Sequence, residues 1–589
     1  MYRKTDPQQS LFGVETQLSK SLQSRLQGSW ANLFRAEILP ILLKSEDDFA
    51  SLYGKTGRPN FSVARMLALC LLQELYNMSD QQTLDTFGFD IRWRYALDTS
   101  DDDAYISRRS LVEFRRRLAG CDPKMTLVRS VFNSISKAAI SKLGLSAADQ
   151  RVDSTLVVSN ICNRGRLDLF NKTIEHFIKS LDKARFSRIP KYIQKWHEQQ
   201  PDGLFGAGPV ERKQTLRQLS KYLNRLITIF KNDPHVSDSE PYQLMVRLFK
   251  EQCMVQDQSG SCTGKRNGKQ IKVKNKTKGE QLQSPYDPDA SYGHKGNGYS
   301  THITETCNNK NSCEIITDYE VHGAARSDIG KAVDVVNRLA LAGLKPAKLF
   351  ADGGYPSVPS SLDIVGHDIK FMAPVNRPRI SDQTMGRELF TFDKDGCVLR
   401  CPQQHRPVAH RMRSSNNKKG KALHAIFNGD ICRACGKLEQ CPVRAPNNRE
   451  RGCNARNTIG NFRLEVTAQL RLRDQMYADQ QTDEWKQQYK IRAGIEATMS
   501  ELKRRHGMGK LRVRRAPKVC FSVACKVIAC NIKRWAKAAA ASSRSLLHIW
   551  CHILAPLSPV EVLKEQLKPI CTDYKLICYK VIWAPETGI

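Results

Sequence analysis

The chain has 589 residues, with 93 Lys and Arg against 59 Asp and Glu, which gives a formal net charge of +34 at pH 7. This length exceeds what one hydrophobic core supports, so we expect about three domains or subdomains. The excess positive charge favours a polyanionic partner, most simply nucleic acid. The longest apolar run, at 66–72, is too short to cross a bilayer, and the N-terminus lacks a secretory signal. The sequence therefore argues against a membrane-spanning protein and predicts a cytoplasmic one.

The first 145 residues are predicted to be helical. Apolar positions recur at helical spacing over 61–87. Residues 107–120 show a short basic amphipathic pattern, with Ser107 as the expected N-cap. Sustained alternation of apolar and polar residues, which would indicate strands, is absent from this part of the sequence.

The character of the sequence changes at residue 150. The β-branched run at 150–160 predicts a short strand. Helical patterns return over 165–250. Residues 265–280 are rich in Lys, Gly and Asn and predict a loop, which is either a solvated surface loop or an arm that contacts phosphate.

Strand patterns resume before residue 300. Strands are predicted at 298–307, 313–322 and 346–355, and a helix is predicted at 327–342. Ser327 is the expected N-cap of that helix. Residues 356–480 interrupt the pattern again and contain one further predicted strand, "IKFMAPV".

Two aspartates occupy positions that favour chemistry. Asp153 stands inside a β-branched strand, where an aspartate is unfavourable unless it has a role. Asp352 ends the apolar strand "KLFADGGY", and ligand sites in α/β sheets lie outside the carboxyl ends of strands. The alternatives are a strand-edge aspartate in water and an ordinary turn aspartate before Gly-Gly.

A third carboxylate lies in "YKIRAGIEATMSELKRRHGMGK" (489–510). If this stretch is one helix, Tyr489, Arg492, Glu496 and Lys503 fall within an arc of roughly 60°. One acid flanked by two cations and a phenol is suited to a metal ion beside a phosphate backbone. The alternative is a solvated helix face that carries an ordinary i,i+4 ion pair.

Together the three carboxylates indicate a site for divalent metal ions. Hard oxygen ligands suit Mg²⁺ or Mn²⁺. Two such ions can activate water and stabilise the leaving oxygen of a phosphodiester. The positive charge of the chain would supply affinity for DNA.

At these motifs the sequence resembles the DDE-class transposases of bacterial insertion sequences. The motifs are "VDST" with Asp153, "SPYDPDASYGHKGNGYSTHI" (284–303), "ADGGY" with Asp352, and Tyr489-x2-Arg492-x3-Glu496-x6-Lys503. Residues 57–98 also resemble the helical N-terminal domain of these enzymes, and the resemblance covers roughly residues 50–535.

The resemblance implies an α/β fold, with an RNase H-like mixed sheet and flanking helices, preceded by an all-α N-terminal domain. The implied parts are a helical DNA-binding domain at 1–145, a catalytic domain at 146–535 with insertions at about 165–283 (helical) and 356–480 (Cys-containing), and a C-terminal extension of unknown role at 536–589.

The resemblance also implies a site and an activity. Asp153, Asp352 and Glu496 would bind two Mg²⁺ or Mn²⁺ ions. Activated water would then free a 3′-hydroxyl at the transposon end, and this hydroxyl would attack target DNA. The side chains that would contact DNA phosphates are Tyr489, Arg492 and Lys503.

The expected partners are terminal inverted repeats and target DNA. A homodimer would bring two transposon ends together at the bacterial nucleoid, and no membrane partner is expected. The residues alone do not separate a transposase from a metal-dependent DNA nuclease without strand transfer. An inactive DNA-binding relic is a further alternative.

Nineteen cysteines in a reducing compartment do not indicate a disulfide framework. Four of them are arranged as a C-x2-C with two further cysteines in a Gly- and Pro-containing region: Cys401, Cys432, Cys435 and Cys441. Four thiolates can form a tetrahedral structural Zn²⁺ site, and His405 or His410 could replace one of them. The alternative is a group of reduced thiols without a ligand. Such an ion would stabilise the insertion and would take no part in catalysis.

Overall fold

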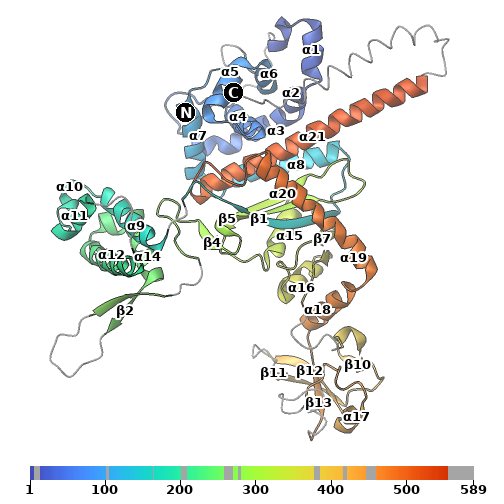
Figure 1. Ribbon diagram of the computed structural model, residues 1–589. Coiled ribbons are helices and arrows are strands. Elements are labelled where there is room, and N and C mark those ends of the chain that lie inside the picture. Colours follow the sequence, from blue (N-terminus) through green and yellow to red (C-terminus); the bar gives the residue numbers. More distant parts are fainter. Residues whose placement is uncertain are drawn as a thin grey trace, which may run out of the picture. The chain divides into compact units, whose positions relative to one another are not determined.

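The computed structural model describes residues 1–5, 13–100, 105–162, 165–199, 208–257, 269–275, 280–376, 385–414, 421–445 and 459–554 (Figure 1). Residues up to Lys533 belong to one compact unit, and those from Arg534 belong to a second. Most of the expected C-terminal extension at 536–589 lies outside the described residues. No helix among the described residues is long and apolar enough to cross a membrane.

The described residues before the first strand form helices. They are a 3-10 helix Val14–Gln17, α1 Lys20–Gln27, α2 Trp30–Leu33, a π-helical turn Phe34–Ile38, α3 Leu39–Lys44, a 3-10 helix Glu46–Leu52, α4 Val63–Tyr76, α5 Asp80–Phe89, α6 Ile91–Leu97, α7 Arg108–Cys121 and α8 Thr126–Lys142. Ser107 caps α7 as predicted. The helical spacing at 61–87 corresponds to two helices, α4 and α5, which are separated because Asn77 adopts a left-handed conformation (φ 53°) and Ser79 begins α5 with a capping box.

A six-stranded mixed sheet forms the centre of the first unit (Figure 1). Its strands are β1 Asp149–Val157, β4 Ser291–Gly293, β5 Gly296–Thr306, β6 Ile316–Gly323, β7 Lys348–Phe350 and β8 Lys370–Met372. The order is β4-β5-β1-β7-β8, and β6 also pairs with β5. Strands β1, β7 and β8 are parallel, whereas β5 runs antiparallel to β1, β4 and β6. The chain therefore has an α/β fold, as predicted.

The register of β1 and β7 aligns the two candidate aspartates. Arg151 pairs with Phe350 in the parallel ladder. Asp153 follows Arg151 by two residues, and Asp352 follows Phe350 by two residues. Asp352 therefore comes just after the carboxyl end of β7, at the level of Asp153 on β1.

Two helices connect β6, β7 and β8: α15 Lys331–Leu341 and α16 Val358–Gly366. The prediction that Ser327 caps α15 is wrong, since the N-cap is Gly330 with φ 82°. The Ser327 hydroxyl instead accepts a hydrogen bond from the backbone of Ile329. It thus makes a local turn before the helix begins.

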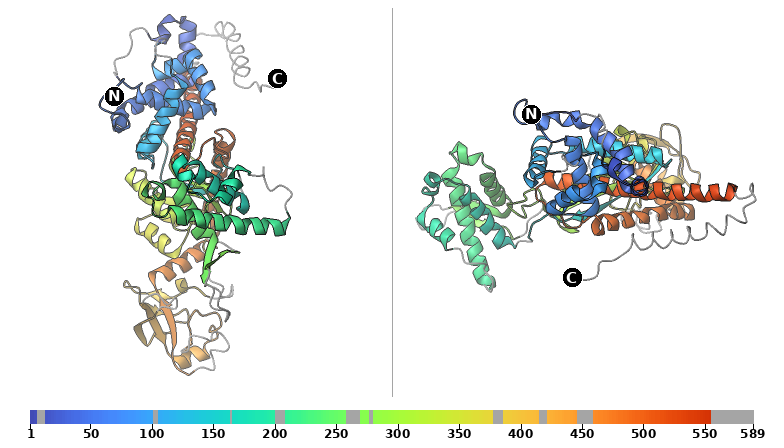
Figure 2. Two further views of the ribbon diagram at one scale, coloured as in Figure 1. Left: turned by 90° about the vertical axis from the view of Figure 1, so that its left-hand side faces the viewer. Right: turned by 90° about the horizontal axis from the view of Figure 1, so that it is seen from above.

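The segment after β1 forms a helical bundle with its own core, coloured teal in Figure 2. Its helices are α9 Arg166–Lys179, α10 Lys183–Phe186, α11 Lys191–Glu198, α12 Pro209–Phe230, α13 Pro234–Ser237 and α14 Glu240–Gln252. Phe170, Phe177 and Phe230 are fully buried in it. A hairpin of β2 Cys253–Asp257 and β3 Lys269–Val273 follows.

Strand β3 overturns part of the predicted loop at 265–280. Its sequence, KQIKV, alternates polar residues with β-branched ones. The surrounding lysines obscured that short alternation. Residues 258–268 and 276–279 lie outside the described part of the chain.

The part of the sequence between β8 and the late helices forms another small core. Its elements are a 3-10 helix Arg387–Leu389, β9 Thr391–Phe392, β10 Val398–Arg400, β11 Ala409–Ser414, β12 Lys421–Phe427, α17 Gly429–Ala434 and β13 Phe462–Val466. Strands β9 and β10 form one sheet, and β11-β12-β13 form another. Phe390, Phe427 and Phe462 are buried in their shared core. Strand β8 belongs to the central sheet, although it falls within the range predicted as an interruption.

The late helices are α18 Ala468–Asp479, α19 Asp483–Tyr489, α20 Ile495–Arg504 and α21 Ala516–Leu554. The prediction of one helix over 489–510 is wrong, because a 3-10 segment at Lys490–Gly494 separates α19 from α20. Within the first unit, Asn531 of α21 donates a hydrogen bond to the carbonyl of Ile316. Lys526 of the same helix bonds the Glu74 carboxylate and the His506 carbonyl.

Candidate active site

Arg492 is the centre of the candidate site. Its Nη2 lies 2.7 Å from Oδ2 of Asp153 and 3.9 Å from Oδ2 of Asp352. Its Nη1 lies 3.8 Å from Oε1 of Glu496. The three carboxylates predicted from the sequence therefore meet around one guanidinium, although they come from β1, from the loop after β7 and from α20.

The three carboxylates differ in their exposure to solvent. The side chain of Asp153 is 14% exposed, that of Asp352 is 37% exposed and that of Glu496 is 72% exposed. Burial raises the pKa of Asp153 above its ordinary value, although the positive charge of Arg492 opposes this shift. The site thus has a buried floor and an open side from which a large substrate could approach.

Backbone amides orient the two aspartates. The Ser154 amide donates to Oδ1 of Asp153 at 2.7 Å, and the Gly354 amide donates to Oδ1 of Asp352 at 2.9 Å. Each carboxylate therefore keeps its second oxygen, Oδ2, directed toward Arg492. Glu496 lies in the first turn of α20, where the helix dipole favours a negative charge.

Tyr489 is held against the site by the protein itself. Its hydroxyl donates to the carbonyl of Ala351 at 2.9 Å, and its ring stacks on Trp485 with centroids 4.5 Å apart. Burial raises the pKa of Tyr489 to about 12. The hydroxyl thus fixes the backbone position that immediately precedes Asp352.

A buried ion pair, absent from the predictions, fixes the 3-10 segment to the sheet. Arg151 Nη2 lies 2.7 Å from Oε1 of Glu305, its partner in the β1–β5 ladder. Arg151 Nη1 also donates to the Ile491 carbonyl at 2.6 Å, and Thr498 donates to Oε2 of Glu305 at 2.6 Å. A Cβ on Gly494 would lie 2.2 Å from Arg151 Nη1. The only signal in the sequence is an Arg two residues before Asp153, which shares its face of the strand.

Lys295 is a second residue that the sequence did not single out. Its Nζ donates to Oγ of Ser154 at 2.7 Å, and Ser154 donates to Asp328 at 2.7 Å. The charge of Lys295 also lowers the pKa of Asp153, against the larger effect of burial. Lys503, which was predicted to contact DNA, is exposed on α20.

A buried histidine pair lies beyond Ser154. Nε2 of His302 and Nε2 of His322 are 2.8 Å apart, and both are near Asp328. Nδ1 of His302 faces the Tyr355 hydroxyl, and Nδ1 of His322 faces the Gly323 carbonyl. Both rings are satisfied if the Tyr355 hydroxyl donates to Nδ1 of His302, Nε2–H of His302 donates to Nε2 of His322, and Nδ1–H of His322 donates to the Gly323 carbonyl. Burial lowers the pKa of His302 to about 4, in agreement with a neutral network.

The carboxylate set has the chemistry of a divalent cation site. Three carboxylates within 4 Å of one guanidinium are already arranged around a positive charge. Their hard oxygens are ligands that Mg²⁺ and Mn²⁺ prefer. The donor atoms therefore suit such ions, but the ligand oxygens of the three side chains do not all lie within 4.8 Å of one another, so binding would have to draw them together.

Two parts of the chain match family models. Residues 400–536 match a family described as Transposase DDE domain, and residues 31–117 match one described as Transposase domain (DUF772). The two matches indicate a transposase. The DDE match includes Glu496, whereas Asp153 and Asp352 lie outside both matched segments. No curated protein and no solved structure matches the chain.

Proposed function

We propose that this transposase is a DDE enzyme of a bacterial insertion sequence with an RNase H-like catalytic core. The observation that carries the proposal is the meeting of Asp153, Asp352 and Glu496 around Arg492. The order of the parallel strands supports it, because β1, which carries Asp153, lies beside β7, which ends two residues before Asp352.

In this proposal Asp153, Asp352 and Glu496 would hold two divalent ions, Mg²⁺ or Mn²⁺. Bound there, the ions would supply activation of the attacking hydroxyl and neutralisation of charge on the phosphate. Arg492 neutralises the carboxylates in the free protein. If bound metal ions neutralise the carboxylates instead, the planar guanidinium of Arg492 can turn to a DNA phosphate.

The remaining residues orient the substrate and the site. Tyr489 holds the backbone before Asp352 in place. Lys503 is exposed and can reach a phosphate as a point charge. Arg151 and Glu305 hold the segment that carries Arg492 against β1.

The proposed reaction is hydrolysis at the terminal inverted repeats followed by strand transfer into target DNA. The net charge of +34 supports binding to DNA, at the nucleoid in the bacterial cytoplasm. Two ends must be joined to one target, so we propose a homodimer in the synaptic complex. The helices of residues 1–145 are the proposed end-binding region.

The decisive experiment is Mg²⁺-dependent cleavage of DNA that carries the element's own ends. Glu496→Gln keeps the size of the side chain and removes its charge. We expect this variant to bind the ends and to lose cleavage. Glu484→Gln is the matched control, because Glu484 is also an exposed glutamate in the first turn of a neighbouring helix. Equal cleavage by wild type and Glu496→Gln would overturn the triad.

A second assay uses ends that have already been cut. Joining of these ends to target DNA supports strand transfer. Cleavage without joining would instead assign the protein as a metal-dependent nuclease, and end binding without cleavage by wild type would identify an inactive relic.

A further inference from the structure

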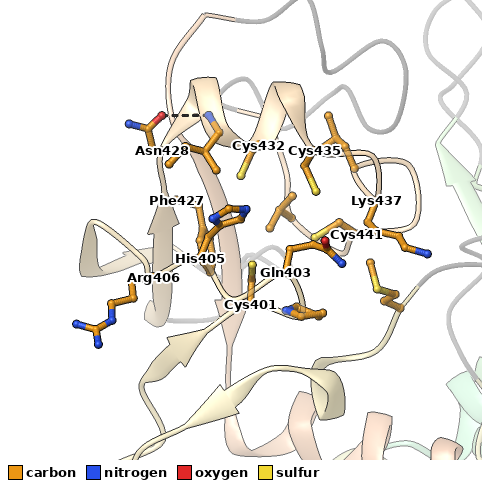
Figure 3. A pocket seen from close by; sticks show the side chains of 15 residues that line it. Cys401, Gln403, His405, Arg406, Phe427, Asn428, Cys432, Cys435, Lys437 and Cys441 are labelled. Atoms are coloured by element: carbon orange, nitrogen blue, oxygen red, sulfur yellow. Dashed lines mark hydrogen bonds between the residues drawn. The ribbon is translucent and has the colours of Figure 1, made fainter.

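Four cysteines line one small cavity in the core between β10 and α17 (Figure 3). They are Cys401, Cys432, Cys435 and Cys441. Figure 3 shows their side chains directed into the cavity from opposite sides. The space that water could occupy there is about 30 Å³, which suits a single small ion better than an organic ligand.

Three of these thiols come from α17 and the turns that follow it. The amide of Cys435 donates to the carbonyl of Cys432, that of Leu438 donates to Cys435, and that of Cys441 donates to Leu438. The helix ends where Cys435 becomes extended, with ψ 124°. This short, tightly turned segment brings Cys432, Cys435 and Cys441 to the lining of the same cavity.

Cys401 approaches from the other wall. It follows β10 and begins a tight turn, in which the Gln404 amide donates to the Cys401 carbonyl at 2.8 Å. Gln404 has φ 64°, a left-handed conformation that reverses the chain. His405 lines the same cavity, whereas His410 lies on β11 and does not line it.

The four thiols are partly buried beside the apolar residues of one core. The surrounding core is small, and it consists of one two-stranded and one three-stranded sheet. Small cores of this kind are commonly stabilised by a structural metal.

We propose that Cys401, Cys432, Cys435 and Cys441 bind one structural Zn²⁺ ion. With Zn–S bonds of about 2.3 Å, the sulfur atoms of a tetrahedral site lie about 3.8 Å apart. Among the described residues, ligand atoms of three His, Cys, Asp or Glu side chains come within 4.8 Å of one another at two places, and neither includes these cysteines. Binding must therefore draw the four sulfurs closer together.

The test measures metal content in the full-length protein, purified under reducing conditions from cells supplied with zinc. We expect about one zinc per chain by elemental analysis. Replacement by Co²⁺ should give the strong thiolate-to-metal absorption and tetrahedral visible bands of four-sulfur coordination. Wild-type protein that binds neither ion would overturn the proposal. This measurement does not depend on whether any variant folds.

Variants then locate the ion. Cys435→Ser is expected to lose the zinc, whereas Cys397→Ser is expected to keep it, because Cys397 lies in the same segment but does not line the cavity. Retention of zinc by Cys435→Ser, or its loss from Cys397→Ser, would overturn the assignment. His405→Ala should keep both the zinc and the four-sulfur spectrum of Co²⁺. A changed spectrum would show that His405, and not one of the four proposed thiolates, is a ligand.

Discussion

Nη2 of Arg492 lies 2.7 Å from Oδ2 of Asp153, although 339 positions separate the two residues in the chain. This contact closes the candidate site, because it joins the first strand of the central sheet to the segment just before α20. It also places a guanidinium between carboxylates that would otherwise repel one another.

Replacing Arg492 by Gln is expected to slow cleavage of end DNA by about 100-fold, the usual order for loss of one group that stabilises developing charge. Arg492→Lys should fall between this variant and wild type, because it keeps the charge and loses the planar fork. Single-turnover cleavage rates measure both effects. Wild-type rates in Arg492→Gln would remove this guanidinium from the mechanism.

Tyr489→Phe separates a positioning role from a phosphate contact. The variant loses the hydrogen bond to Ala351 and keeps the stacking on Trp485. A lost hydrogen bond of about 1 kcal/mol predicts cleavage slower by roughly five- to tenfold with unchanged affinity for end DNA. Weaker DNA binding at an unchanged cleavage rate would instead place the hydroxyl on a phosphate.

Gly494→Ala is expected to lower the free energy of unfolding by about 1–3 kcal/mol and to reduce cleavage. The added Cβ would lie 2.2 Å from Nη1 of Arg151, and that guanidinium is held by Glu305 and the Ile491 carbonyl. Gly88→Ala serves as the control, since a Cβ there meets no atom within 4 Å. Urea denaturation should show no loss of stability for Gly88→Ala. Equal stability of Gly494→Ala and wild type would mean that Arg151 moves aside freely.

Glu305→Gln leaves the buried Arg151 without its counter-charge. The Glu305 side chain is fully buried, and loss of one partner of such a pair costs about 3–5 kcal/mol. The double variant Arg151→Met/Glu305→Leu should recover much of that loss, because it removes both charges. A double-mutant cycle of unfolding free energies measures the coupling. Additive effects would show that the pair does not act as a unit.

The burial of His506 predicts that the free energy of unfolding falls at acid pH. Burial lowers its pKa to about 4, whereas an unfolded histidine titrates near 6.5. Between these values the unfolded chain binds the proton first, so stability is full above about pH 6.5 and falls as the pH approaches 4. The maximum effect is about 3 kcal/mol.

The comparison that isolates this effect is wild type against His506→Asn, which can still donate to the Glu74 carbonyl that Nδ1 of His506 faces. The advantage of wild type in unfolding free energy should shrink as the pH falls from 7 to 4. A difference that does not change with pH would show that His506 does not titrate as its burial predicts.

The sequence predicted the strands of the central sheet except β4, and it pointed to the candidate carboxylates, because both depend on local patterns. Asp153 in a β-branched run and Asp352 before Gly-Gly are recognisable from their neighbours. The contacts of Arg151 with Glu305 and Ile491 are not, since residues far apart in the chain make them. Local patterns also did not predict the 3-10 segment at 490–494, because its backbone is set by its contact with β1. They did not predict β3 either, because its alternation covers only five residues.

The distance along the chain between Asp153 and Arg492 has a consequence for synthesis. A ribosome that adds about 5–20 residues per second needs roughly 20–70 s to pass from one residue to the other. During that time the Asp153 carboxylate of β1 has no Arg492 to pair with, because the segment that carries this guanidinium has not yet been made. The helical bundle after β1 has its own core and can fold in the interval. Assembly of the candidate site is therefore among the last events of biogenesis, and a prematurely terminated chain would contain folded parts without this site.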